Sequence, residues 1–171
     1  MLGWITEKPK TRVPLVLLAA CILALGGAYT AEYGFGLRPC ILCLYQRIPY
    51  AAVGLLALIT LVRHRTVRVG ALLLMSVLAF SVEAGIAFYH VGVEYHWWAG
   101  TSGCTPGTDP TDSIELLRQQ IAEAPLVSCD EPALVVLGLS MAGWNIVYAL
   151  VLLSFCILVI RRLKGRPSRA T

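Results

Sequence analysis

Four apolar stretches, each near the ~20 residues that a helix needs to cross a bilayer, constrain the fold of this chain more than any other feature. They cover residues 13–30, 44–62, 69–89 and 142–160. Hydrophobic residues make up 57% of the sequence and charged residues 14%, whereas soluble domains carry about 25% charged residues. We therefore expect an all-α fold, a four-helix bundle in the membrane that forms one domain over residues 1–171.

The positively charged residues predict how the helices are oriented. Eleven of the fourteen Lys and Arg residues precede the first stretch, fill the gap between the second and third, or follow the fourth. The positive-inside rule therefore predicts that both termini lie in the cytoplasm and that the loops at residues 31–43 and 90–141 face outward. The net charge of +4 belongs to these membrane flanks, so it does not indicate a nucleic-acid partner.

The first stretch has one alternative interpretation, because its basic start and small-residue end are typical of a secretory signal peptide. Its apolar part is longer than the roughly 7–15 residues of a usual signal core. Its removal would also place the new N-terminus a few residues before Cys40. We expect it to be a membrane span.

The second outer loop differs from the spans in composition. Residues 101–110 are rich in turn formers, so they do not form a buried element. Asp112 and Glu115 have the spacing of a capping box, and apolar residues recur at helical spacing from Ile114 onward. We expect a short amphipathic helix over residues 113–122 on the outer membrane surface, although an ordinary surface helix fits the same pattern.

Four of the six cysteines lie in the outer loops. Cys40 and Cys43 end the first loop, and Cys104 and Cys129 lie in the second. Thiols outside a bacterial cytoplasm meet an oxidising environment, so we expect disulfides, although four cysteines allow three pairings. The other two cysteines lie inside apolar spans, where a small buried hydrophobic residue is the expected role.

The Cys40-x-x-Cys43 pair carries the chemistry of the chain. It lies where a short loop enters an apolar helix, and two cysteines at this spacing close a strained, redox-labile disulfide rather than a structural one. If the residues from Leu44 onward are helical, Cys43 and Arg47 are four residues apart and share a face. The pattern indicates electron chemistry at the membrane boundary.

Together these features resemble the disulfide bond formation protein B (DsbB) family. Its members are inner-membrane oxidases that pass electrons from a periplasmic thioredoxin-fold dithiol oxidase (DsbA-like) to quinone. The resemblance covers most of the chain: four spans, Pro-Cys-x-x-Cys before the second span, and a cysteine pair in the second outer loop. Residues 38–47, 84–98 and 129–145 especially resemble the alphaproteobacterial branch.

The resemblance implies a place and a mechanism. The chain would lie in the bacterial inner membrane with both loops in the periplasm, supporting disulfide formation in periplasmic proteins. The reduced partner would attack the Cys104–Cys129 disulfide, with Cys104 as its attachment point. Electrons would pass through a link between Cys129 and Cys40 to the Cys40–Cys43 pair, and Cys43 would reduce ubiquinone or menaquinone. A helix N-terminus and Arg47 would favour the reactive thiolate of Cys43.

Other polar residues at the outer boundary have two interpretations each. Arg47 is the best candidate for the quinone site, or else an arginine that extends to the interface. The resemblance places His90 near the quinone headgroup; otherwise it is a boundary histidine. Glu83 lies inside the third span, where an acid is costly, and would relay a proton or make a structural hydrogen bond. Glu94 and His96 are expected to be solvated loop residues.

Three other function classes fit parts of the pattern. A vitamin K epoxide reductase type also joins a helical bundle to Cys-x-x-Cys and quinone, but its active pair lies late in the bundle. A metal site would use Cys40, Cys43, His90 and His96; with one tight Cys-x-x-Cys motif, we expect no metal. A non-catalytic scaffold would carry two structural disulfides.

Overall fold

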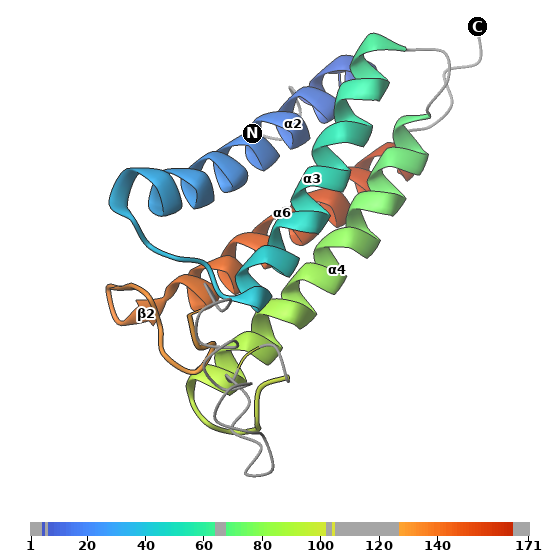
Figure 1. Ribbon diagram of the computed structural model, residues 1–171. Coiled ribbons are helices and arrows are strands. Elements are labelled where there is room, and N and C mark those ends of the chain that lie inside the picture. Colours follow the sequence, from blue (N-terminus) through green and yellow to red (C-terminus); the bar gives the residue numbers. More distant parts are fainter. Residues whose placement is uncertain (1–4, 6, 64–67, 102–103, 105–126, 166–171) are drawn as a thin grey trace, which may run out of the picture.

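The computed structural model describes residue 5 and residues 7–63, 68–101, 104 and 127–165. The amphipathic helix expected at residues 113–122 lies outside these residues, so its prediction stays untested. The described helices and strands are α2 (Pro9–Tyr29), the π-helix η1 (Thr30–Gly34), α3 (Ile41–Val62), α4 (Val69–Glu94), β1 (Val135–Val136), β2 (Leu139–Ser140) and α6 (Met141–Lys164) (Figure 1).

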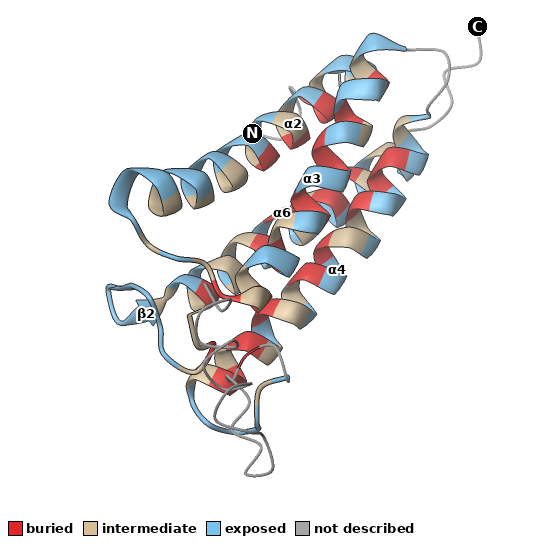
Figure 2. Ribbon diagram, viewed as in Figure 1, coloured by how far each residue is buried: buried red, intermediate tan, exposed pale blue. Residues whose placement is uncertain are grey.

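Four of these segments are long and apolar enough to cross a membrane: α2 with η1, then α3, α4 and α6. This confirms the expected all-α, four-helix membrane bundle. The helices pack as neighbours in the pairs α2–α3, α3–α4 and α4–α6. Many helix residues are exposed (Figure 2), and a large number of them are apolar, as is favourable for a protein whose surroundings are lipid chains.

The interior of the bundle is built mainly from apolar side chains of all sizes. Val13 and Leu17 of α2 pack in one core with Val53 of α3 and Phe80 of α4. A Cβ atom added at Gly54 would lie 3.2 Å from the Cβ of Cys21, so glycine allows α2 and α3 to approach closely.

The ends of the helices follow local chemistry. Ser140 is the N-cap of α6, and its hydroxyl accepts a hydrogen bond of 3.1 Å from the Gly143 N–H. The last turn of α6 carries three basic residues, which interact favourably with the negative end of the helix dipole. Helix α4 runs to Glu94, five residues beyond the end of the apolar stretch at 89, so His90 lies on the helix rather than at its end.

Candidate active site

The N-terminus of α3 is formed by the cysteine pair itself. Cys40 is the N-cap residue, and its Sγ accepts a hydrogen bond of 3.3 Å from the Cys43 N–H. The two Sγ atoms lie 2.8 Å apart without a disulfide bond. The helix starts three residues earlier than the expected residue 44, so its N-terminal N–H group acts on Cys40 and not on Cys43.

Cys40 is the thiol that this arrangement activates. The hydrogen bond from the Cys43 thiol, helped by His90, lowers the pKa of Cys40 to about 4, although burial acts in the opposite direction. Cys40 is only 4% exposed. It therefore combines thiolate character with a site from which water is largely excluded.

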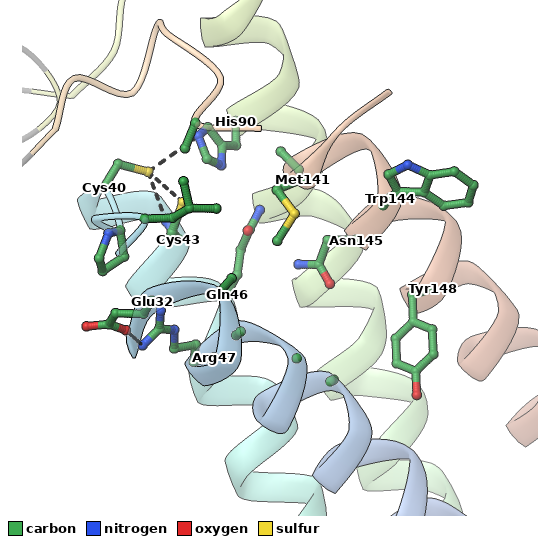
Figure 3. A pocket seen from close by; sticks show the side chains of 18 of the residues that line it. Glu32, Cys40, Cys43, Gln46, Arg47, His90, Met141, Trp144, Asn145 and Tyr148 are labelled. Atoms are coloured by element: carbon green, nitrogen blue, oxygen red, sulfur yellow. Dashed lines mark hydrogen bonds and ion pairs between the residues drawn. The ribbon is translucent and has the colours of Figure 1, made fainter. Parts of the chain in front are cut away.

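His90 approaches the pair from α4. Its Nε2 lies 3.5 Å from the Cys40 Sγ and 3.9 Å from a carboxylate oxygen of Glu94, one helical turn further along α4. Its Nδ1 is buried without a partner. His90 is therefore in contact with the redox pair, as Figure 3 shows.

Glu94 corrects a prediction, because it is not a solvated loop residue. Its side chain is 6% exposed, and its carboxylate accepts a hydrogen bond from the Ser140 hydroxyl at the start of α6. His96, by contrast, is exposed as expected. Sequence reasoning missed Glu94 because it follows the last apolar turn of its span, where an acid usually faces water.

Arg47 is paired with an acid that sequence reasoning also missed. Its Nη1 lies 2.6 Å from a carboxylate oxygen of Glu32 in η1, and its guanidinium carbon lies 4.8 Å from the centre of the Tyr29 ring. Neither contact involves Cys43, so the shared helix face brings Arg47 to the same cavity without an ion pair to that thiol. The available signal was an acid within reach of the expected end of the first span.

A cavity of about 520 Å³ joins these groups. Its polar wall contains Glu32, Cys40, Cys43, Gln46, Arg47, His90, Glu94 and Asn145. Its apolar wall comes mainly from α2, with Leu23, Ala24 and Gly27, and from α6, with Val147 and Val151. In Figure 3 the cysteine pair and His90 lie at one end, with Trp144 and Tyr148 of α6 on the opposite side.

Three nitrogen atoms of cavity-lining residues are buried without a hydrogen-bond partner. They are the Gln46 Nε2, the Arg47 Nε and the His90 Nδ1. A buried polar group without a partner costs roughly 1–3 kcal/mol. The Gln46 amide and the Arg47 Nε–H are donors, so the cavity fits a mainly apolar ligand that carries hydrogen-bond acceptors.

Glu83 is fully buried in α4 but is not among the residues that line the cavity. One of its oxygens accepts a hydrogen bond from the Asn145 side-chain amide, and the Asn145 oxygen accepts one of 2.7 Å from the Tyr50 hydroxyl. The second oxygen of Glu83 is unpartnered. Its link to the cavity therefore runs through Asn145 and Tyr50.

Cys104 and Cys129 are joined in a disulfide that packs against the redox pair. They are 3% and 0% exposed and share an apolar cluster with Cys40, Leu42 and Val93. The family resemblance implies that a reduced partner attacks this bridge, but both of its cysteines are buried. Attack on this bridge by an external thiolate would therefore require the cluster to open.

The three side chains at the end of the cavity also have the composition of a metal site. The ligand atoms of Cys40, Cys43 and His90 all lie within 4.8 Å of one another. His96, the fourth ligand that a metal site was expected to use, is not part of this group among the residues described.

Comparisons with known proteins agree with this chemistry. Residues 10–159 match the family model described as "Disulfide bond formation protein DsbB". A protein of Rickettsia prowazekii described as "Uncharacterized protein RP370" is 32% identical over 149 residues, which is 85% of each chain. Two proteins named "Disulfide bond formation protein B" are each 30% identical: that of Herminiimonas arsenicoxydans over 86% of this chain and 93% of its own, and that of an Acidovorax strain over 98% and 97%. No solved structure matches the chain.

Proposed function

The chain belongs to the disulfide bond formation protein DsbB family, and from this premise we propose that it is a quinone-dependent thiol oxidase of the bacterial inner membrane. In this proposal it reoxidises a periplasmic, DsbA-like thioredoxin-fold protein and passes the electrons through Cys104–Cys129 and Cys40–Cys43 to ubiquinone or menaquinone. Both outer loops then face the periplasm and both termini the cytoplasm.

One observation carries the proposal: the cysteine pair opens into a cavity with apolar walls and unpartnered hydrogen-bond donors. A quinone is a flat apolar ring with two carbonyl oxygens, and it accepts two electrons and two protons. The residues that would hold it are Gln46 and Arg47, through their free N–H groups, with His90 beside the pair. The apolar residues of α2 and α6 suit its ring and isoprenoid tail.

The first exchange takes place at the loop disulfide. A thiolate of the reduced partner attacks the Cys104 Sγ, so that Cys129 leaves as a thiolate and a mixed disulfide forms. The partner's second thiol then attacks its own half of the mixed disulfide and releases Cys104. The partner is oxidised, and Cys104 and Cys129 are reduced.

The second exchange uses the low pKa of Cys40. Cys129 attacks Cys40 in the Cys40–Cys43 disulfide, and Cys43 leaves. Cys104 then attacks Cys129 and restores the loop disulfide, with Cys40 as the leaving group. A thiol of low pKa leaves faster, and its stabilised thiolate makes the disulfide a stronger oxidant.

Side chains near Cys40 can also accept and stabilise its proton. The His90 Nε2, 3.5 Å from the Cys40 Sγ, is the nearest base among the described residues. Glu94 lies 3.9 Å from the same nitrogen and would stabilise a proton held there. When the pair returns to the disulfide, the thiol proton of Cys43 and a proton held on His90 are the two protons available at this end of the cavity.

The test is quinone reduction by the detergent-purified protein, supplied with a reduced thioredoxin-fold oxidase and followed by the loss of quinone absorbance. Turnover should depend on the partner and disappear in Cys43→Ser and Cys104→Ser. Cys21→Ser is the matched control, because Cys21 is buried in the bundle core away from both pairs. Failure of several quinones and partners to turn over would contradict the proposal.

The cluster of two thiols and an imidazole supports a second candidate function, the binding of a thiophilic cation such as Zn²⁺. Zinc analysis of protein purified under reducing conditions separates the two. A stoichiometric metal that survives in Cys104→Ser but is lost in His90→Ala would favour the metal site, and a metal-free, active protein would favour the oxidase.

A further inference from the structure

The β1–β2 hairpin presents an apolar surface that the redox chemistry does not use. Its strands pair in antiparallel register, Val135 with Ser140 and Val136 with Leu139. The apolar side chains of the hairpin are exposed: Val135 53%, Val136 43%, Leu137 88% and Leu139 38%. The chain has no charged residue from 132 to 160, so no charge of this segment lies beside these apolar side chains.

The turn of the hairpin carries an unfavourable residue. Leu137 and Gly138 have φ angles of 53° and 81°, which are the left-handed values of a two-residue hairpin turn that favours Asn-Gly. A leucine with positive φ is strained, because its Cβ approaches the backbone. Leu137 is 88% exposed, so no packing against the residues that the structure describes compensates for this strain. An apolar environment around the tip would do so.

The backbone of the hairpin is suited to such an environment. The Trp144 indole N–H donates a hydrogen bond of 2.9 Å to the Val136 carbonyl, and the Met141 N–H donates one of 3.2 Å to the Leu134 carbonyl. These bonds satisfy carbonyl groups that would otherwise need water. A lipid contact therefore requires less desolvation of polar groups here than at an ordinary sheet edge.

The hairpin leads directly into α6. It projects sideways from the bundle at the start of α6, at the end where α3 begins (Figure 1), and residues 133–139 are exposed (Figure 2). Directly after it, Met141, Trp144 and Val147 on α6 are 40%, 38% and 43% exposed. These three side chains also line the cavity, whereas Leu150 and Leu158 further along α6 do not and are 47% and 44% exposed. Such side chains of a membrane-spanning helix contact lipid, so the exposed apolar hairpin lies directly before a helix that has a lipid-facing side.

We propose that the hairpin at residues 133–140 is a membrane anchor whose tip, Leu137, inserts into the headgroup and acyl boundary of the leaflet on the Cys40 side. Its partner is the lipid surface itself. Because the hairpin lies between Cys129 and α6, insertion fixes the depth of the loop end that carries Cys129. The proposal needs only the membrane embedding of the bundle and is independent of the identity of the electron acceptor.

The first experiment uses the full chain in phospholipid nanodiscs with a photoreactive benzoylphenylalanine at position 137. Mass spectrometry should find a phospholipid adduct at that position. The matched control places the same group at Glu131, an exposed position before the hairpin, where no lipid adduct is expected. Capture of an added thioredoxin-fold oxidase or of a second copy, or the absence of a lipid adduct, would overturn the proposal.

The second experiment separates lipid burial from turn stability by hydrogen exchange of the residue 135–140 amides in the same nanodiscs. Leu137→Asn gives the turn its preferred Asn-Gly sequence, so turn stability alone predicts slower exchange. Loss of the lipid contact predicts exchange about ten-fold faster, because the free energy of burying a leucine side chain is lost. Leu137→Phe should remain protected. Unchanged or slower exchange in Leu137→Asn would refute insertion.

Discussion

A carboxylate oxygen of Glu32 lies 2.6 Å from the Nη1 of Arg47, so an ion pair connects the end of the first span to the second. The two side chains are 21% and 15% exposed. The pair holds the guanidinium at the cavity wall while its Nε–H stays free of protein partners. Glu32 is thus a positioning residue for the side chain that would bind the quinone.

Replacing Glu32 by Gln should lower both stability and quinone affinity. The mutation leaves Arg47 as a poorly hydrated charge without its counter-ion, at a cost of about 1–2 kcal/mol, less than for a fully buried pair. We expect a lower apparent melting temperature and a higher KM for quinone, with exchange between the cysteine pairs unchanged. Glu7→Gln is the control, since the Glu7 partner of Arg12 is 66% exposed. Equal effects of the two mutations would argue against a positioning role.

The reactivity of Cys40 should be almost independent of pH over the neutral range. Its lowered pKa of about 4 means that the thiolate dominates above that pH and is lost as the pH falls through it. In Cys43→Ser, a hydroxyl donor remains and alkylation of Cys40 should stay rapid at pH 6. In Cys43→Ala, the donor is gone and the alkylation rate should rise with pH toward the ordinary thiol pKa of 9.0. The background lacks Cys104 and Cys129, and identical pH profiles for the two variants would contradict this account.

Loosening the apolar cluster around the loop disulfide should speed its reduction. Leu42 is 4% exposed and packs with Cys104 and Cys129, and a large-to-small change at a buried leucine costs roughly 2–5 kcal/mol. Leu42→Ala should therefore expose the bridge more often and raise its rate of reduction by dithiothreitol. Leu73→Ala in the bundle core should destabilise the protein without this effect. If both variants are reduced at the wild-type rate, burial does not protect the bridge.

The hydrogen-bond chain from Tyr50 through Asn145 to Glu83 should matter more for stability than for turnover. Asn145→Ala removes two hydrogen bonds and leaves a buried carboxyl group unpaired, so we expect a loss of roughly 2–4 kcal/mol. Glu83→Gln keeps an acceptor for Asn145 and should melt close to the wild-type temperature with its quinone reduction intact. A large loss of kcat in Glu83→Gln would instead identify Glu83 as a proton relay.

The helices were predictable because each needs only one property, a long apolar run without charges. That property also placed the cysteine pair at the start of α3. Its first helical residue, Ile41, was missed because the cap is a cysteine side chain, which is not among the usual N-cap residues. The hairpin was missed because Val135 and Leu139 are apolar and directly precede an apolar span. In the sequence they are not distinguishable from the beginning of that span.

The contacts of the site depend on how the helices are positioned against one another in space. No sequence pattern in this chain predicts that positioning. Glu32 and Arg47 are fifteen residues apart, and Glu94 and Ser140 are forty-six apart. Neither separation corresponds to a helical or strand period. Arg47 was predicted as a site residue and lines the cavity, whereas its counter-ion was missed.

The number of residues in the π-helix η1 determines whether Glu32 faces Arg47. Its five residues, Thr30–Gly34, follow α2 directly and form a wider turn that includes Glu32. An α-helix advances by about 100° per residue, so deleting Thr30 or Ala31, which precede Glu32 in η1, would turn the acid away from Arg47. Insertions and deletions at this point should therefore be tolerated only together with a change at position 47. In a comparison of relatives, the gap pattern between the first span and the Cys-x-x-Cys motif would then indicate which of them can form this ion pair.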